Sequence, residues 1–403
     1  MTRTKASAKL PVPTGKRGTF APYRLLSPMM YNIGKLRVFE RGASDMDKIH
    51  INLGKDSYDI LIDTGLVRKA GPAIRDLTGA EKAAIITEDG IDKLYGMSLV
   101  KSLEEAGVRT QMIVVPSSEK SRTLQVVRRV YGALVDFGLG SSDTLIALGG
   151  RVVGDITGFT AATYHRGISY VQFPTSVLSQ IGSSIGGKVT LDLDIPAGKN
   201  VVGTFYQPKA VFVDPGMAKT LPRRYFHNGL GEAVKLGCVA DKALFELFEQ
   251  VSSDMDIYRV LPEIIRRCCA IKAHYVEIDP FSKGERRILD FGHTIGGAIE
   301  RCLRYNDAEI THGEATAIGM YLITRRSELE GLTKRGTTSR LEYVLKSLSL
   351  PVSTTVPYDI LYEAVKHDKK IKGDVIQITL IKEIGKGFLY TLPVKEIGQF
   401  LKS

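Results

Sequence analysis

From about residue 48, short apolar segments typical of β-strands alternate with amphipathic segments typical of α-helices. Predicted strands cover residues 83–86, 111–115 and 144–148, and an amphipathic helix is predicted over residues 123–137. This alternation predicts a parallel sheet that is covered by helices on both faces. Because ligands of such sheets bind beyond the carboxyl ends of the strands, we expect a binding site in the loops at those ends.

Helical periodicity dominates the chain after about residue 215. The clearest predicted helices cover residues 225–239, 242–251, 261–277, 294–304 and 313–329, with two short strands near 375–381 and 387–391. A chain of 403 residues exceeds the size of one hydrophobic core, so two domains are expected. We predict an α/β nucleotide-binding domain with a Rossmann-like parallel sheet over residues 46–215, which opens with strands 49–53 and 58–62. A mostly α-helical, metal- and substrate-binding domain then covers residues 216–403, with the site in the cleft between the two.

The net charge of +11 arises mainly from residues 1–45, which carry nine Lys or Arg and two acidic residues. The remainder shows no continuous basic stripe with interleaved aromatic residues, so we expect no nucleic-acid partner. We predict that residues 1–45 form a disordered basic extension. The alternatives are that they form an organelle-targeting segment or that they lie upstream of a true translation start at Met46.

The apolar runs and the cysteines bear on the compartment. No run approaches the roughly 18 to 20 apolar residues needed to span a bilayer, so we expect no membrane partner. The four cysteines, Cys238, Cys268, Cys269 and Cys302, lack the spacing of a metal site. A set of reduced thiols is the simpler interpretation, and we expect a cytoplasmic protein.

Two glycine-rich regions are candidates for binding anions. Residues 149–155 read GGRVVGD, follow a predicted strand and open a helix, so their backbone N–H groups could hold a phosphate. Glycine turns after strands also occur for steric reasons alone, which leaves nucleotide binding open at this point. Lys188 and Lys199 lie in glycine-rich turns before a predicted strand at 210–213, where they are either solvated or positioned to neutralise an anionic substrate.

Three residues of the helical half form a candidate metal site. Glu232 lies on an apolar predicted helix, and His293 and His312 each adjoin a glycine at the predicted start of a helix. Two histidines and one carboxylate, with a fourth position open, are typical of catalytic zinc. The alternative is two helix-capping histidines and one paired core glutamate, and the distant spacing does not decide between them.

Cations accompany these candidate ligands in the sequence. Lys235 follows Glu232 by three residues on the same helical face, while Lys272 and Arg286 lie on the segments that lead to His293. They either form ion pairs within the helices or line a basic pocket for a substrate that carries both phosphate and carboxylate.

Taken together, these segments resemble the 3-dehydroquinate synthase family of sugar-phosphate cyclases, from about Met46 to Ser403. The ordered matches include FPTS at 173–176, GKN at 198–200, FYQPKA at 205–210, GLGEAVK at 229–235, FGHT at 291–294, HGE at 312–314 and HDKK at 367–370. So many motifs in the family's order make the resemblance specific.

The resemblance implies a role for each matching residue. Zinc, or cobalt as the alternative ion, would be bound by Glu232, His293 and His312. NAD would be contacted by Glu119, Arg122, Gly149, Gly150, Arg151, Gly154, Asp155, Thr175, Ser176 and Thr220. The phosphate and carboxylate of an anionic sugar-phosphate substrate would be held by Lys188, Lys199, Asn200, Lys235, Lys272, Arg286 and Lys370. Arg166 would reach into the neighbouring subunit's site, which implies a homodimer.

The implied reaction is the shikimate-pathway conversion of 3-deoxy-arabino-heptulosonate 7-phosphate to 3-dehydroquinate and phosphate, a step of aromatic amino acid biosynthesis. It proceeds by transient oxidation with NAD, loss of phosphate, re-reduction and an intramolecular aldol closure. The cofactor ends unchanged, so the protein mainly supplies orientation and electrostatics.

Four positions depart from the family's pattern. Arg151 replaces a loop glycine, Gly182 an aspartate, Gly297 the second histidine of a GHTxGH motif, and Asp290 an asparagine. Losing one donor from a site commonly costs about 3 kcal/mol of transition-state stabilisation. A diverged cyclase with another sugar-phosphate substrate and a catalytically impaired zinc-binding homologue are therefore the alternatives to a working synthase.

Overall fold

The computed structural model describes residues 46–195, 198–304, 310–368 and 370–401. These residues all fall within one compact unit, Tyr31–Ser403. The basic extension predicted for residues 1–45 lies outside the described residues. The two-domain division at residue 215 stays a prediction.

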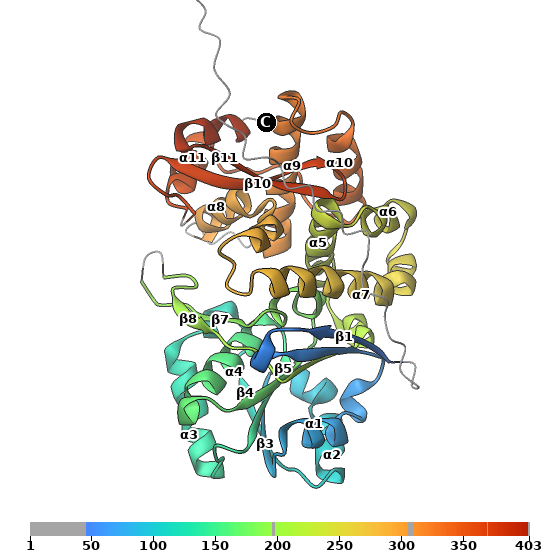
Figure 1. Ribbon diagram of the computed structural model, residues 1–403, viewed down its shortest axis with the longest axis vertical. Helices are drawn as coiled ribbons and strands as arrows, with labels where there is room; N and C mark the ends of the chain where they lie inside the picture. The colour runs from blue at the N-terminus through green and yellow to red at the C-terminus, as the bar shows by residue number, and fades with distance from the viewer. Residues whose placement is uncertain (1–45, 196–197, 305–309, 369, 402–403) are drawn as a thin grey trace, which may run out of the picture. The chain divides into compact units, whose positions relative to one another are not determined.

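A seven-stranded sheet, in the order β1-β2-β9-β6-β5-β3-β4, forms the N-terminal half (Figure 1). Only the pair β1–β2 is antiparallel, so the predicted parallel α/β fold class is confirmed. The strands are β1 (Asp47–Ile51), β2 (Tyr58–Ile62), β3 (Lys82–Glu88), β4 (Arg109–Val115), β5 (Thr144–Gly149), β6 (Ser169–Pro174) and β9 (Ala210–Val213).

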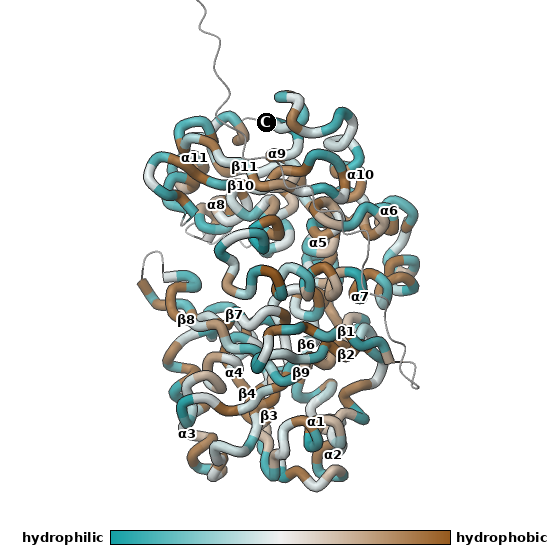
Figure 2. Tube along the Cα trace, viewed as in Figure 1, coloured by the Kyte–Doolittle hydropathy of each residue, from teal (hydrophilic) through white to brown (hydrophobic). Residues whose placement is uncertain are grey.

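Helices cover both faces of this sheet because its central strands are apolar on both sides. In β3, Ala84 and Ile86 pack with α3 (Leu124–Phe137) and α4 (Arg151–Thr163). The alternate residues Ala83 and Ile85 pack with α1 (Gly71–Thr78) and α2 (Met97–Glu105) on the other face. These outer helices alternate hydrophilic and hydrophobic residues along their length (Figure 2).

The strand order reverses between β3 and β5. From β3 the chain moves outward to the edge strand β4, returns to β5 on the other side of β3, and continues to β6. The loops that leave β3 and β5 therefore diverge, and the crevice between them is where ligands of open α/β sheets bind.

The C-terminal half is mostly helical, as predicted, and ends in an antiparallel hairpin. Its elements are α5 (Arg223–Ala240), α6 (Lys242–Gln250), α7 (Asp254–Ile278), α8 (His293–Arg304), α9 (His312–Leu329), α10 (Thr337–Ser347), α11 (Tyr358–Lys366), β10 (Val375–Glu383) and β11 (Lys386–Pro393). The helix α7 packs against β1 and also against α5 and α6 (Figure 1). One hydrophobic core therefore joins the strands β1, β2 and β9 to the helices.

One local expectation was wrong. The helix predicted to start at residue 261 begins at Asp254, because the Ser253 side chain accepts a hydrogen bond from the Asp256 amide and caps it, and Pro262 lies inside the helix. The glycine-rich turns are present, but they flank a second antiparallel hairpin that was not predicted, β7 (Lys188–Leu191) and β8 (Val202–Phe205); Lys188 begins β7 and Lys199 lies in the turn before β8.

Glycines bring the helices that carry the candidate metal ligands close together. A Cβ on Gly313, in the first turn of α9, would lie 2.1 Å from the backbone oxygen of Asn228 in α5. A Cβ on Gly296 in α8 would lie 2.7 Å from the backbone oxygen of Ala315 in α9. Any larger residue at these positions would push the helices apart.

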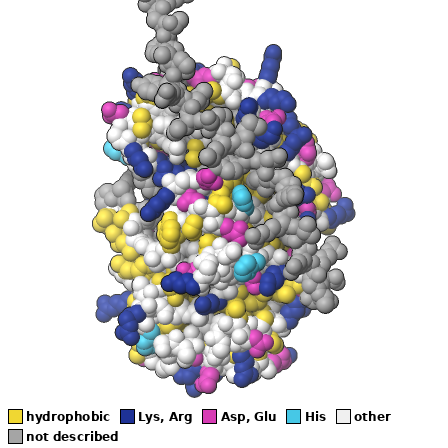
Figure 3. Space-filling view, viewed as in Figure 1, with side chains coloured by type: hydrophobic (Ala, Val, Ile, Leu, Met, Phe, Trp, Pro, Cys, Tyr) yellow, Lys and Arg dark blue, Asp and Glu magenta, His cyan; other side chains and the backbone are white. Residues whose placement is uncertain are grey.

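The surface carries mixed charge on the face drawn in Figure 3, where Lys and Arg side chains are scattered among acidic and apolar ones. In the described part of the chain, no helix combines the length and the apolar character that a membrane crossing requires.

We predict opposite effects of alanine at two helical glycines. Gly313→Ala should lower the free energy of unfolding by about 1–3 kcal/mol, because the methyl group overlaps the α5 backbone. Gly132→Ala, in α3 with nothing within 4 Å of the new Cβ, should raise it by about 0.5–1 kcal/mol. Urea unfolding measures both, and a Gly313→Ala protein as stable as the wild type would contradict the close approach.

Candidate metal and nucleotide site

Glu232, His293 and His312 converge from three helices. Glu232 lies in the buried middle of α5, and the histidines are the first residues of α8 and α9. A capping box between Thr311 and Glu314 fixes the start of α9 at His312. One ligand atom from each of the three residues lies within 4.8 Å of the others, so together they could hold a metal ion.

The protonation states of these donors suit a cation. Burial opposes ionisation of Glu232, but Lys235 and His293 outweigh it and lower the pKa of the carboxyl to about 2. Burial, aided by Lys235, lowers the pKa of His293 to about 4. A carboxylate and a neutral imidazole are therefore present at neutral pH, as metal ligation requires.

Lys235 lies between two of the candidate ligands. Its Nζ is 2.7 Å from Glu232 Oε1 and 3.0 Å from His293 Nε2. The ammonium thus offers positive charge to the same donors that a metal ion would use. A divalent ion bound to all three ligands would require Lys235 to release His293 Nε2.

A second carboxylate lies behind each histidine. His293 Nδ1 is 3.5 Å from Asp290 Oδ1, and His312 Nδ1 is 2.6 Å from Glu300 Oε1. Sequence reasoning missed Glu300, although its place seven residues after His293, on the same face of α8, could have indicated it. Such carboxylates orient metal-ligating imidazoles and raise their basicity.

Asp290, the departure from the family's asparagine, faces cations as well as His293. Its Oδ2 is 3.6 Å from Lys370 Nζ, which also donates to Thr294 Oγ1 at 3.2 Å. Although burial opposes it, the charges of Lys370, His293 and Lys188 hold the pKa of Asp290 well below its usual range. The added negative charge is therefore balanced by cations rather than left beside an anionic substrate.

Lys188 and Arg286, two further predicted substrate cations, lie near Lys272 on α7, whereas Lys199 pairs with Glu300. Burial, followed by the charges of Arg286, Lys235 and Lys188, lowers the pKa of Lys272 to about 7. Arg286 is buried and donates to the backbone oxygens of Gly186 at 3.3 Å and Pro280 at 2.8 Å. Burial also lowers the pKa of Arg286. So much positive charge in one buried region is costly unless an anion binds there.

The nucleotide part of the candidate site lies at the reversal of strand order. Gly150 precedes α4, whose N-terminus has no side-chain cap and no acidic residue in its first turn, so its amides suit a phosphate. The Gly150 amide donates to Glu88 Oε1, at the end of β3, at 3.2 Å. Sequence reasoning missed Glu88, although its position at a strand end could have indicated it.

The other predicted cofactor residues flank this loop. A Cβ on Gly149 would lie 2.6 Å from Val153 and one on Gly154 2.9 Å from Gln172, so both glycines allow close packing of α4. Thr175 and Ser176 follow β6, and the Thr175 amide donates to the Gly149 oxygen at 3.0 Å. Thr220 Oγ1 lies 2.8 Å from Tyr95 Oη.

Two arginines cross-link the acidic residues of the predicted cofactor segment. Arg122 is fully buried and pairs with Asp155 at 2.6 Å and with Asp192 at 2.8 Å. Arg151 lies 3.8 Å from Glu119 and 3.7 Å from Asp155. It also donates to the side-chain oxygen of Asn200 at 3.1 Å. The Arg151 side chain therefore pairs with acidic residues of the predicted cofactor segment and also reaches Asn200, a predicted substrate residue.

Two of the departures remove side chains next to the metal ligands. A Cβ on Gly182 would lie 3.9 Å from Glu232 Cγ, and the nearest atom to a Cβ on Gly297, one turn after His293, is Arg301 Nη1 at 3.8 Å. At both positions a Cβ would meet only ordinary van der Waals contacts. Arg166 is exposed, with φ of 66°, and takes part in none of the contacts above.

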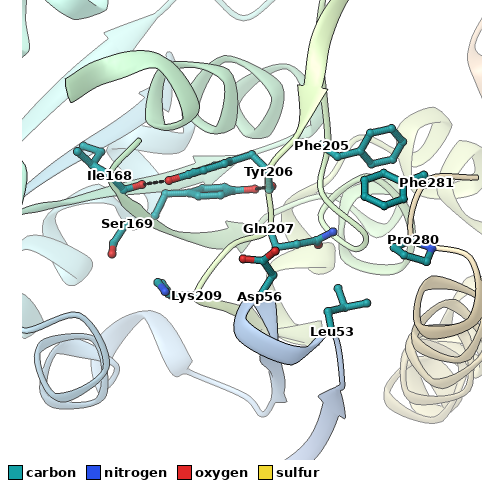
Figure 4. Close-up of a pocket in the computed structure, with 11 residues that line it drawn as sticks. Leu53, Asp56, Ile168, Ser169, Phe205, Tyr206, Gln207, Lys209, Pro280 and Phe281 are labelled. Carbon is teal, nitrogen blue, oxygen red and sulfur yellow. Dashed lines mark hydrogen bonds between the residues drawn. The ribbon is translucent and has the colours of Figure 1, made fainter. Parts of the chain in front are cut away.

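A separate pocket of about 270 Å³ contains none of the predicted site residues (Figure 4). The stacked rings of Tyr170 and Tyr206 line one side, and Phe205 and Phe281 line another. Tyr206 Oη donates to the Ile168 oxygen at 2.8 Å.

Comparisons with known proteins agree with this arrangement. Family models described as 3-dehydroquinate synthase N-terminal and C-terminal match residues 112–228 and 229–371. A 3-dehydroquinate synthase of Clostridium acetobutylicum is 44% identical over 358 residues, which cover 89% of this chain and 99% of that protein. One of Enterococcus faecalis is 42% identical over 355 residues, with 88% and 98% covered.

Solved structures of related cyclases share the fold. The 2-epi-5-epi-valiolone synthase ValA of Streptomyces hygroscopicus, solved with NAD+ and Zn2+, has a TM-score of 0.77 at 28% identity and covers 87% of this chain and 97% of its own. A 2-deoxy-scyllo-inosose synthase, solved with carbaglucose-6-phosphate, NAD+ and Co2+, has a TM-score of 0.77 at 21% identity, with 88% and 99% covered, and supports the fold alone. By its family models and its relatives, the chain belongs to the 3-dehydroquinate synthase family.

Proposed function

We propose that this protein is a 3-dehydroquinate synthase, which converts 3-deoxy-arabino-heptulosonate 7-phosphate to 3-dehydroquinate and phosphate. The observation that carries the proposal is the convergence of Glu232, His293 and His312 within 4.8 Å, in a chain 44% identical to a 3-dehydroquinate synthase. Their donor set fits zinc, with cobalt as the alternative ion.

The residues present also fit NAD. The uncapped N-terminus of α4 lies at the reversal of strand order, where the pyrophosphate of a dinucleotide binds in such sheets. When bound, NAD would accept and return a hydride, and zinc would polarise and acidify a substrate hydroxyl. The residues proposed to hold NAD are Glu119, Arg122, Gly149, Gly150, Arg151, Gly154, Asp155, Thr175, Ser176 and Thr220, joined by Glu88.

The cations around the metal ligands would hold the two anionic ends of the substrate. Lys272 is partly buried and Arg286 is buried, and binding of phosphate or carboxylate would offset the cost of their desolvation. Because its pKa is about 7, Lys272 can also exchange a proton with a bound group at neutral pH. Lys188, Lys199, Asn200, Lys235 and Lys370 complete the proposed substrate site.

The activity is tested by incubating the protein with Zn2+, NAD and the heptulosonate phosphate. We expect phosphate and 3-dehydroquinate in equal amounts, with no net NADH. His312→Ala should lower the rate by about 100-fold or more, because the polarising ion loses a ligand. Glu249→Gln, which breaks a distant ion pair with Arg340, should stay active.

Two outcomes would contradict this function. Absence of phosphate above the blank would indicate an impaired homologue, and steady accumulation of NADH would indicate a dehydrogenase.

We further propose a cytoplasmic homodimer in which Arg166 reaches the partner's substrate site. His165 and Arg166 hold consecutive left-handed backbone conformations, with φ of 47° and 66°. Such conformations each cost about 1–3 kcal/mol and cluster at functional sites. Recovery of the protein from an organelle or membrane fraction would contradict the cytoplasmic location.

Mixing two inactive variants tests the role of Arg166. If subunits exchange at random between Arg166→Ala and His312→Ala dimers, half of the dimers become mixed. Each mixed dimer contains one complete site of its two, so about a quarter of the wild-type activity should return. Each variant alone is the control. No recovery after verified exchange would show that Arg166 does not act across subunits.

A further inference from the structure

Glu300 on α8 uses its two carboxylate oxygens for two different cationic groups. Oε1 lies 2.6 Å from His312 Nδ1, and Oε2 pairs with the Nζ of Lys199. Glu300 is 7% exposed, whereas the side chains of Lys199 and His312 are partly exposed. Because Glu300 is buried, losing either partner would leave its charge uncompensated. That loss costs more free energy than breaking a surface ion pair.

The contact with His312 determines which imidazole nitrogen can bind a metal. An ionised carboxylate only accepts hydrogen bonds, so the proton of His312 must reside on Nδ1. The lone pair is then on Nε2, which is free to serve as the ligand atom. Glu300 therefore holds both the tautomer and the orientation that a metal ion at Glu232, His293 and His312 requires.

The contact with Lys199 reaches into the other half of the fold. Lys199 lies in the segment between β7 and β8, where the neighbouring Asn200 amide donates to Asp192 Oδ1 at 2.7 Å. Asp192 pairs in turn with Arg122 at 2.8 Å, which pairs with Asp155 in the predicted cofactor segment. A line of ion pairs and hydrogen bonds, joined through the Lys199–Asn200 peptide, thus runs from His312 through Glu300 to the nucleotide part of the site.

We propose that Glu300 is a positioning residue that couples metal binding at His312 to the placement of Lys199 beside the substrate. The inference rests on the proposed function in that it takes the three converging residues as metal ligands. Glu300 itself touches neither substrate nor metal in this account. It fixes one ligand and one substrate cation at once, so each should respond to the other.

The test uses metal-stripped full-length protein titrated with Zn2+ against a chromogenic chelator. Glu300→Gln should weaken zinc binding by about 10- to 100-fold, the usual effect of removing a carboxylate behind a ligating histidine. Glu300→Asp keeps the charge and should lie between Glu300→Gln and the wild type. Glu249→Gln, which removes the same charge from a remote ion pair with Arg340, should bind zinc like the wild type.

Hydrogen exchange supplies a readout of the coupling. Adding Zn2+ to the wild type should slow exchange of the backbone amides at 198–203, and Glu300→Gln should lose this response. Lys199→Met should also lose the exchange response, and should weaken zinc binding by less than Glu300→Gln does, because the coupling is reciprocal but the His312 contact remains.

The outcomes separate this inference from the proposed function. Two outcomes would overturn the coupling alone. In the first, the wild type and folded Glu300→Gln bind zinc with equal affinity. In the second, zinc still slows amide exchange at 198–203 in Lys199→Met. A wild-type protein that binds no zinc would overturn the metal assignment and the coupling together.

Discussion

The close approach of three helix segments around Glu232 is the constraint on which the rest of the site depends. Gly296 lets α8 lie against α9, and Gly313 lets α9 lie against α5, so that His293 and His312 lie near a carboxylate in a buried helix. A buried carboxylate must be compensated by positive charge. Lys235 supplies that charge at 2.7 Å, and the same donor geometry suits a divalent ion.

Positive charge spreads outward from this centre. Lys272 is partly buried and Arg286 is buried, and burial lowers the pKa of both; the charges of Arg286, Lys235 and Lys188 lower the pKa of Lys272 further. Glu300 and Asp290 pair with two other predicted substrate cations, Lys199 and Lys370. The result is a region of excess positive charge that favours an anion, next to the strand ends where a dinucleotide would bind.

Much of this could be predicted from the sequence because the signals are local. The apolar run before Gly149 predicts a buried strand and a loop at its carboxyl end, and the T-H-G-E stretch at 311–314 predicts the start of a helix. The family motifs then assign the metal ligands. The sequence did not predict the strand β6, although it ends in the FPTS motif. Its place in the sheet is defined by its pairing with β5 and β9.

What the sequence could not supply depends on distant contacts. Glu300 reads as an ordinary helical glutamate until the fold places it between His312 and Lys199, which are far from each other along the chain. Asp290 looked unfavourable beside an anionic substrate, yet Lys370 lies close enough to balance it. A Cβ on Gly182 would lie beside Glu232, and one on Gly297 beside Arg301, which only the packing of the helices reveals.

X-ray absorption at the zinc edge of the zinc-loaded protein tests the central claim most directly. We predict two imidazole nitrogens and one carboxylate oxygen at about 2.0–2.2 Å, with one imidazole lost in His312→Ala. Sulfur ligands at about 2.3 Å, or a spectrum unchanged by that substitution, would mean that the ion binds elsewhere and that these three residues do not form the metal site.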